Sequence, residues 1–150
     1  MIKGNYKYSD LTEKIIGCSM KVHTFLGNGF PEVIYQRSLA IELEKSGINF
    51  KRELEQDIYY DNIKVGTRIV DFLIEDRVLV ELKALGEINE NHYSQVLNYL
   101  KAYKLEIGLL INFGAKSLQF KRFINSNLWE NQRNQLIRLI CDYDATRNMD

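Results

Sequence analysis

Two neighbouring segments in the middle of the chain constrain its fold most strongly, because in both of them one face is apolar with a period of two. The segments are Arg68–Ile74 and Arg77–Lys83. The apolar faces consist of Val70, Phe72 and Ile74 in the first segment, and of Val78, Val80 and Leu82 in the second. This alternation is typical of β-strands, and the connection Glu75–Arg77 is short enough for an antiparallel hairpin.

Matching the two apolar faces sets the register of this predicted hairpin. The pairs are 70 with 82, 72 with 80 and 74 with 78. A slip of one residue would turn one apolar set away from the other, so the register is well specified. It places Asp71 opposite Glu81, and Lys83 lies on the same face, opposite Ile69.

Opposed side chains in such a pair have Cβ atoms about 5 Å apart, where two carboxylates repel each other. We therefore expect Asp71 and Glu81 either to have raised pKa values or to recruit a cation, and oxygen ligands suit Mg²⁺ or Mn²⁺. A cluster of Asp71, Glu81 and Lys83 needed only for folding is the alternative. It is the weaker interpretation, because a buried acid pair is a poor way to gain stability.

The rest of the chain predicts helices and strands around this hairpin. The helices are predicted from Ser9–Asp10 to Gly27, from Pro31 to Gly47, over Glu90–Leu105, and around Leu128–Ile140. Further strands are predicted at Ile48–Phe50, Ile58–Tyr60, Ile63–Val65, Ile107–Phe113 and Leu118–Phe123. This order predicts an α+β fold with a central mixed sheet of about five strands flanked by helices. Without a linker or a repeat, we expect residues 1–150 to form one domain, with a core at about 10–124 and a C-terminal helical extension at 125–150.

The charges cancel over the whole chain but not along it. The chain has 20 basic and 20 acidic residues, so its formal net charge is zero. This balance excludes a protein that coats nucleic acid through bulk charge. Residues 51–100 carry six basic and ten acidic groups, and residues 101–150 carry eight and five. This gradient indicates either unevenly charged solvated faces or a cation site beside a phosphate-binding surface. The longest apolar stretches have about five residues, too few for a membrane helix. We expect a cytoplasmic protein without a membrane partner.

Three motifs carry a family resemblance. Asp71 followed by Glu81-x-Lys83 resembles the signature of the PD-(D/E)XK nuclease superfamily, with Val70 in place of the usual proline. Gly29–Tyr35 matches the motif that names the GxxExxY protein family, a branch of this superfamily. Gln95–Tyr99 resembles the QxxxY element of RecB-like and Cas4-like nucleases. The resemblance covers about residues 10–124 and implies a restriction-endonuclease-like fold.

The resemblance also implies roles for individual side chains. Asp71 and Glu81 would ligate the metal, with Glu32 as a further ligand and catalytic residue. Lys83 would orient the attacking water, and Gln95 would hold that water or a phosphate oxygen.

Three more residues, Tyr99, His92 and Lys101, are candidates for substrate binding. Several of the candidate side chains, including Glu32 and Gln95 from the proposed catalytic set, also have a purely structural interpretation. Glu32 suits the first turn of a helix, Gln95 and Tyr99 suit the border of an amphipathic helix, and a lone histidine is usually structural.

The function that follows is hydrolysis of phosphodiester bonds in nucleic acid, with DNA favoured and with Mg²⁺ or Mn²⁺ as cofactor. The alternatives are a catalytically inactive binding or assembly module with the nuclease fold, and a metal-dependent enzyme for another phosphorylated substrate. The four intact residues Asp71, Glu81, Lys83 and Gln95 favour an enzyme. The resemblance further implies a homodimer that spans a duplex.

Overall fold

The computed structural model describes residues 8–125, so the predicted helix around Leu128–Ile140 lies outside the described residues. The elements in chain order are α1 (Ser9–Leu26), α2 (Glu32–Lys45), β1 (Phe50–Tyr60), β2 (Ile63–Ile74), β3 (Val78–Lys83), α3 (Glu90–Tyr103), β4 (Ile107–Asn112) and β5 (Gln119–Ile124). Within residues 8–125, no helix combines the length and the hydropathy that crossing a membrane requires.

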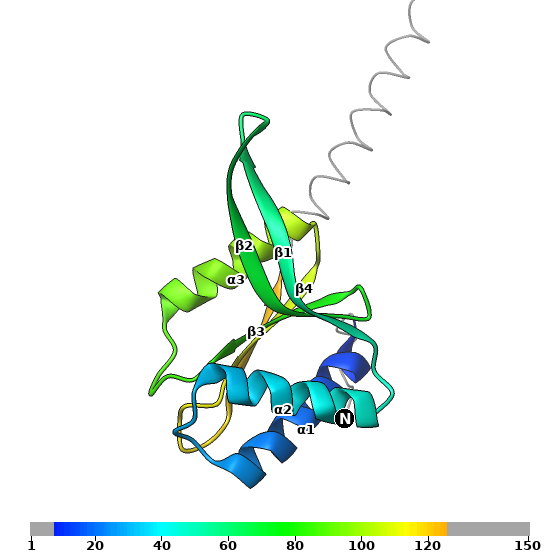
Figure 1. Cartoon of the computed structure of the whole chain (residues 1–150), viewed down its shortest axis with the longest axis vertical. Coiled ribbons are helices and arrows are strands. Elements are labelled where there is room, and N and C mark those ends of the chain that lie inside the picture. The colour runs from blue at the N-terminus through cyan, green and yellow to red at the C-terminus, as the bar shows by residue number, and fades with distance from the viewer. Residues whose placement is uncertain (1–7, 126–150) are drawn as a thin grey trace, which may run out of the picture.

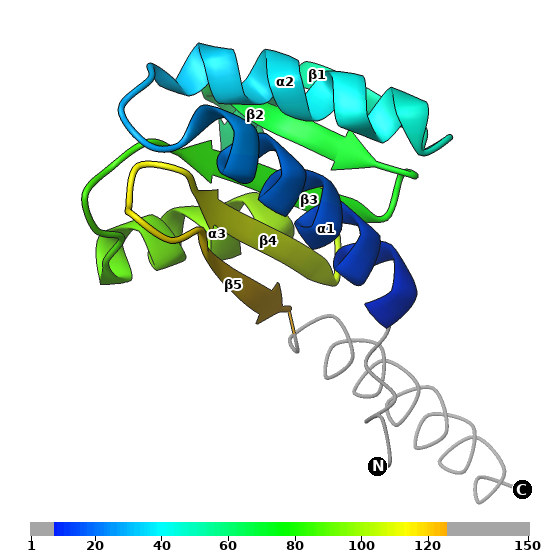
Figure 2. The ribbon, with the colours of Figure 1, turned by 90° about the horizontal axis from the view of Figure 1, so that it is seen from below.

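The five strands form one mixed sheet in the order β1-β2-β3-β4-β5. Neighbouring strands are antiparallel except β3 and β4, which are parallel and are connected through α3. Helices α1 and α2 cover one face of the sheet and α3 lies on the other (Figure 2). The predicted α+β fold with a mixed five-stranded sheet is therefore confirmed.

The sheet separates two hydrophobic clusters. The cluster under α1 and α2 includes Ile15, Leu39, Phe72, Val80 and Leu109, all fully buried. The cluster under α3 consists of Val70, Leu79, Val96, Tyr99, Leu100, Leu110 and Phe123. Because both faces of β3 and β4 are buried, these central strands hold their backbones rigidly between the helices.

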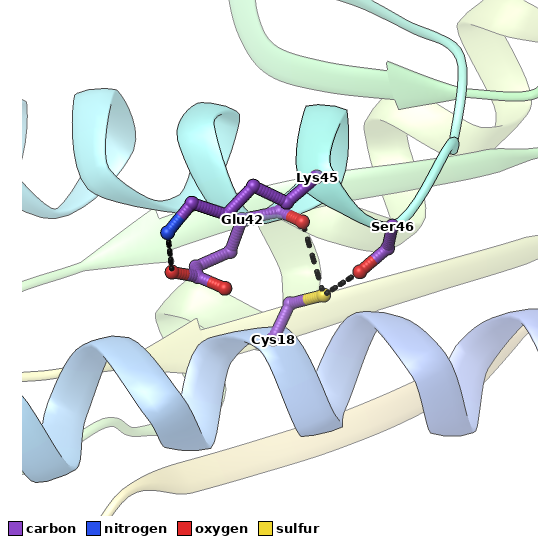
Figure 3. A network of polar contacts seen from close by, with 4 residues as sticks. All are labelled: Cys18, Glu42, Lys45 and Ser46. Atoms are coloured by element: carbon purple, nitrogen blue, oxygen red, sulfur yellow. Dashed lines mark hydrogen bonds and ion pairs between the residues drawn. The ribbon is translucent and has the colours of Figure 1, made fainter.

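A small polar network joins α1 to α2 above the larger cluster (Figure 3). The Sγ atom of Cys18 lies 3.8 Å from the carbonyl oxygen of Glu42 and 3.5 Å from Oγ of Ser46. Lys45 forms an ion pair with Glu42 over 3.4 Å. Cys18 is thus buried at the contact between the two helices, where it helps to set the position of α2 over the sheet.

Strands β1 and β2 are longer than the sequence predicts. Of the predicted strand Ile48–Phe50, only Phe50 belongs to a strand, β1, and the predicted strand Ile58–Tyr60 is the end of that same strand. The segments Ile63–Val65 and Arg68–Ile74 are both parts of β2. The outer halves of β1 and β2 project from the body as a two-stranded ribbon (Figure 1). Most side chains there are exposed, so no apolar period marks the strand. We call this ribbon, residues 54–70, the arm.

The predicted register of β2 and β3 is confirmed where the two strands pair. Phe72 lies opposite Val80 and Ile74 opposite Val78, and the ladder between these strands ends at Phe72. The prediction that Val70 shares a face with Phe72 is wrong. Val70 packs under α3, whereas Phe72 packs under α1 and α2.

The change of face occurs at Glu53 and Asp71. In the ladder between β1 and β2, Arg52 pairs with Phe72 and Leu54 pairs with Val70, so Glu53 and Asp71 face each other without forming a regular pair. Glu53 has a φ of 53°, in the left-handed region that a side chain rarely adopts. A single left-handed residue turns the strand about its axis, so the residues on either side of it point to opposite layers.

Candidate active site

The acid pair lies where β2 and β3 separate, a place that we call the fork. The backbone N–H of Asp71 donates to Oε1 of Glu81 over 3.2 Å. The backbone N–H of Leu82 donates to Oδ2 of Asp71 over 2.9 Å. Each carboxylate thus accepts a hydrogen bond from the backbone of the opposite strand. The two acids meet through these side-chain contacts rather than as a pair of the ladder.

Helix α2 supplies a third contact to Asp71. Nε2 of Gln36 donates to Oδ1 of Asp71 over 2.8 Å, and Gln36 is only 6% exposed. Both oxygens of Asp71 are therefore held by donors from two different elements. Gln36 is not among the site residues that the sequence predicts. Its signal was the spacing of four residues from Glu32, which puts both side chains on one face of a helix.

Beside Asp71 opens a cavity of about 250 Å³ on the α2 side of the fork. It is lined by Glu32, Val33, Gln36, Glu53 and Asp71. The structure thus brings the predicted Glu32 to the edge of the site, and it adds Glu53, which the sequence does not predict either. Glu53 lies in a polar stretch of β1 that carries no periodic signal.

The loop before α2 explains why Glu32 lies there. Gly29 has a φ of 106°, which a residue with a side chain rarely adopts. The buried hydroxyl of Tyr35 donates to the carbonyl of Gly27 over 2.7 Å and accepts the N–H of Phe30 over 3.2 Å. These contacts close the loop and set the start of α2, so Tyr35 packs as a structural residue and Glu32 occupies the first turn.

Three acids around the fork have raised pKa values. Burial raises the pKa of Glu81 to about 8, and the negative charge of Asp71 adds to the effect. Burial also raises the pKa of Asp71, against the hydrogen bonds from Leu82 and Gln36. The pKa of Glu32 is raised by burial of its carboxyl and by Asp71, although the residue as a whole is exposed. In all three cases the charge of Lys83 lowers the pKa, so Lys83 faces the same negative region.

Lys83 ends β3 at a well-supported position. It pairs with Asn112 of β4, and its carbonyl accepts the N–H of Phe113 over 2.8 Å. The buried side chain of Asn112 binds both the N–H and the carbonyl of Leu85, each over 2.9 Å. The backbone that carries Glu81 and Lys83 is therefore braced by β4 on one side.

A second cavity of about 270 Å³ lies on the α3 side of the fork. It is lined by Ile58, Arg68, Gln95, Asn98, Tyr99 and Ala102. Tyr99 is 8% exposed, and its pKa is raised first by burial and then by the charge of Glu81. The structure thus brings Gln95 and Tyr99 into one cavity.

The two remaining candidates lie elsewhere on α3. His92 belongs to the capping box at the start of the helix, where its Nδ1 accepts the N–H of Asn89 over 3.0 Å. Lys101 is exposed in the last turn. Neither of them lines the cavities on the two sides of the fork.

The donor atoms at the fork suit a hard divalent cation. Within residues 8–125, no three His, Cys, Asp or Glu side chains form a group that could hold a metal ion, so Glu32 does not complete such a set with the acid pair. Mg²⁺ in proteins, however, is usually held by one or two carboxylates and keeps several waters. Two converging carboxylates with raised pKa values, in a region with only one nearby lysine, fit such an ion.

Comparisons with known proteins give one family match and two similar solved structures. The model of a family described as the PD-(D/E)XK nuclease superfamily matches residues 9–123. Among solved structures, the chain is similar to the crystal structure of SSO0001, with 13% identity and a TM-score of 0.51 over 87% of this chain and 68% of that one. It is also similar to an alkaline exonuclease (LHK-Exo) from Laribacter hongkongensis, with 9% identity and a TM-score of 0.46 over 95% of this chain and 86% of that one. Among curated proteins, none matches significantly. The similarity to SSO0001 shows the fold.

Proposed function

Because the chain belongs to the PD-(D/E)XK nuclease superfamily, we propose that it is a nuclease that hydrolyses phosphodiester bonds in DNA with Mg²⁺ or Mn²⁺ as cofactor. Nucleases of this superfamily generally use divalent metal ions. The observation that carries the proposal is the reciprocal bonding of Asp71 and Glu81 at the fork, with Lys83 facing both acids. The motif Gly29–Tyr35 supports a place in the GxxExxY branch.

Asp71 and Glu81 are the residues that would hold the metal, together with the main-chain carbonyl of Leu82, and Glu32 would contribute through a water. When bound, the metal stabilises the negative charge that develops on the phosphate during hydrolysis. Gln36 and the N–H of Leu82 already hold the carboxylate of Asp71. This arrangement keeps one ligand in place before any ion arrives, which reduces the ordering that binding requires.

The remaining side chains act on the water and on the substrate. The ammonium group of Lys83 orients the attacking water and offsets negative charge on the phosphate oxygens. From the α3 side, Gln95 holds the water or a phosphate oxygen through its amide. Tyr99 supports Gln95 from the next turn of the helix, because residues four positions apart are neighbours on a helix surface.

An inactive binding or assembly module with the same fold is the rival function. The formal net charge of zero favours it, because the chain itself offers little long-range attraction for nucleic acid. The placement of the acid pair argues against it. A module that binds no metal gains nothing from a buried Glu81 beside a half-buried Asp71, both with raised pKa values.

The test is a cleavage assay over single-stranded DNA, duplex DNA and RNA with Mn²⁺ or Mg²⁺. We expect cleavage of DNA that a chelator abolishes and that Glu81→Ala reduces by at least about a hundredfold. Glu44→Ala, which removes an exposed acid of α2 outside both cavities, is the matched control and should cleave as the wild type does. Equal cleavage by Glu81→Ala and the wild type would contradict the proposal. The oligomeric state of the same samples, measured by ultracentrifugation, tests the homodimer.

A further inference from the structure

The arm carries an arginine next to the candidate site. Arg68 lies on β2, three residues before Asp71, which corresponds to about 10 Å along a strand. Contacts to the end of α3 hold the arm in place: Nε2 of Gln56 donates to the carbonyl of Ala102 over 2.7 Å, and the hydroxyl of Tyr103 donates to the carbonyl of Leu54 over 3.2 Å. The position of Arg68 relative to the fork is therefore determined by the packing of the arm on α3.

The guanidinium group of Arg68 lies against α3. Its central carbon is 5.8 Å from the centre of the Tyr99 ring. This stacking aims the group at the second cavity, between the arm and the helix. The negative charge of Glu81 raises the pKa of the Tyr99 hydroxyl and the positive charge of Arg68 lowers it, so Tyr99 lies within electrostatic reach of both groups.

Arg68 differs from two lysines of β1 and β2, because each of those lysines forms an ion pair with an acid. Lys51 forms an ion pair with Asp76 over 3.0 Å, and Lys64 forms one with Asp57 over 3.2 Å. In the part of the chain that the structure describes, no carboxylate forms an ion pair with Arg68. The two lysines are thus paired with acids, whereas the exposed Arg68 interacts with the neutral side chain of Tyr99, through its ring and its hydroxyl, and its charge is not paired with a carboxylate within the described residues.

The lining of the cavity matches an anionic group of the substrate. Arg68 is its one charged residue, and the amides of Gln95 and Asn98 are its other polar side chains besides the Tyr99 hydroxyl. A planar guanidinium group binds a phosphate through two parallel hydrogen bonds, and side-chain amides add neutral donors. A metal ion would be a poorer match for this cavity, because it would meet the positive charge of Arg68.

We propose that Arg68, with Gln95 and Asn98, binds a backbone phosphate of the nucleic acid next to the phosphodiester that is cleaved. This inference rests on the proposed function and extends it, because it assigns a substrate subsite to the α3 side of the fork. The substrate strand then crosses the acid pair and continues over the cavity that Arg68, Gln95 and Asn98 line. Its register relative to Asp71 and Glu81 is set by the phosphate that Arg68 holds.

The experiment measures binding separately from cleavage. The fluorescence anisotropy of a labelled single-stranded oligodeoxynucleotide is recorded in a chelator, so that no strand is cut. We expect Arg68→Gln to weaken binding about tenfold and to reduce the slope of log K against log salt by about 0.7, as for the loss of one phosphate contact. Lys64→Gln is the matched control on the same strand. It removes a lysine that Asp57 already neutralises, and it should bind within about twofold of the wild type.

A substrate modification tests the same contact from the other side. Neutral methylphosphonate linkages are placed one at a time along the oligonucleotide. In the wild type, one linkage near the cut site should cost about tenfold in affinity, and in Arg68→Gln the same linkage should cost nothing further. Arg68→Lys keeps the charge without the planar fork and should show an intermediate affinity. It also serves as the second variant if Arg68→Gln is poorly folded in thermal melts.

The possible outcomes distinguish a failure of the Arg68 subsite from a failure of the proposed nuclease function. In one outcome the wild type cleaves DNA, and Arg68→Gln binds the oligodeoxynucleotide as tightly as the wild type and with the same salt slope. This result overturns the Arg68 subsite alone. A methylphosphonate scan whose effects persist unchanged in Arg68→Gln overturns it as well. A wild-type chain that neither cleaves nor binds nucleic acid overturns the proposed function and the subsite together.

Discussion

The N–H of Asp71 donates to the carboxylate of Glu81 over 3.2 Å, at the point where β2 leaves β3. A side chain thus occupies a position at which a regular ladder would place a carbonyl. The same exchange in the other direction, from Leu82 to Asp71, makes the arrangement reciprocal. The two strands are held at a fixed separation by the acids themselves, so the chemistry of the site and the shape of the sheet depend on the same two residues.

Gln36 is expected to position Asp71 for the metal. Gln36→Met keeps the volume and removes the donor, which leaves Oδ1 of Asp71 without its partner from α2. A hydrogen bond to a charged group is worth about 1.5–3 kcal/mol, so the dissociation constant of Mn²⁺ should rise at least about tenfold in calorimetry. Arg37→Met, an exposed change on the same helix, should leave the constant unaltered. An unchanged Mn²⁺ affinity in Gln36→Met would show that Asp71 needs no support from α2.

Glu32 is expected to tune the site rather than to hold the ion directly. It lines the cavity beside Asp71 but completes no three-carboxylate group within residues 8–125. Glu32→Gln should therefore reduce Mn²⁺ affinity by less than about threefold, whereas Glu81→Gln should reduce it by at least about thirtyfold. Calorimetry on both variants under one condition gives the comparison. Equal losses in the two variants would make Glu32 a direct ligand.

The stability of the metal-free protein should fall as the pH rises. The pKa of Glu81 is about 8 in the folded state and near 4.5 when unfolded, so between these values the folded chain binds more protons. The free energy of unfolding therefore decreases with pH across this window and levels off above it. The raised pKa values of Asp71 and Glu32 act in the same direction.

Glu81→Gln provides the matched comparison for this pH dependence. The variant should unfold at a higher temperature than the wild type at pH 8.5 or so, and the difference should shrink toward about pH 5, where Glu81 is protonated in the folded state. Adding Mg²⁺ or Mn²⁺ at the higher pH should stabilise the wild type more than the variant. Thermal melts with parallel pH curves for both proteins would contradict the assignment.

Lys83 is expected to matter for the rate more than for folding. Its charge lowers the pKa of Glu32, Asp71 and Glu81, and it ends a strand that β4 braces. Lys83→Met should reduce kcat by about a hundredfold or more and shift the rising limb of the pH–rate profile to higher pH. The sign follows because loss of the cation makes the acids harder to ionise. A profile with an unshifted limb would separate Lys83 from the acid pair.

His92 is expected to act in helix capping. Its Nδ1 accepts the N–H of Asn89, and its side chain lines neither cavity at the fork. His92→Ala should cost about 1 kcal/mol in the free energy of unfolding and leave kcat/KM unchanged. Asn89→Ala, which removes the other half of the capping box, should have a similar effect on stability. A fall in kcat/KM for His92→Ala but not for Asn89→Ala would instead make His92 a substrate contact.

Three features of the protein follow from the sequence because they depend on local patterns. These are the order of the elements, the pairing of Ile74 with Val78 and the meeting of Asp71 with Glu81. Apolar residues with a period of two specify which faces of adjacent strands must match, and a three-residue turn leaves little freedom in the register. The same alternation predicts the wrong face of the sheet for Val70, which packs under α3 and not with Phe72. Nothing in the alternation of β2 reveals that a left-handed Glu53, on another strand, will turn the chain at Asp71.

Only the tertiary structure decided which groups surround the acid pair. Gln36 precedes Asp71 by 35 residues, and their hydrogen bond exists because α2 packs over the end of β2. Arg68 reaches Tyr99 because the arm lies against the last turn of α3. Contacts of this kind depend on how whole elements pack, and packing is set by the summed burial of many side chains rather than by the spacing of a few. The sequence by itself determined the pair of acids, and the fold determined what holds them and what can approach them.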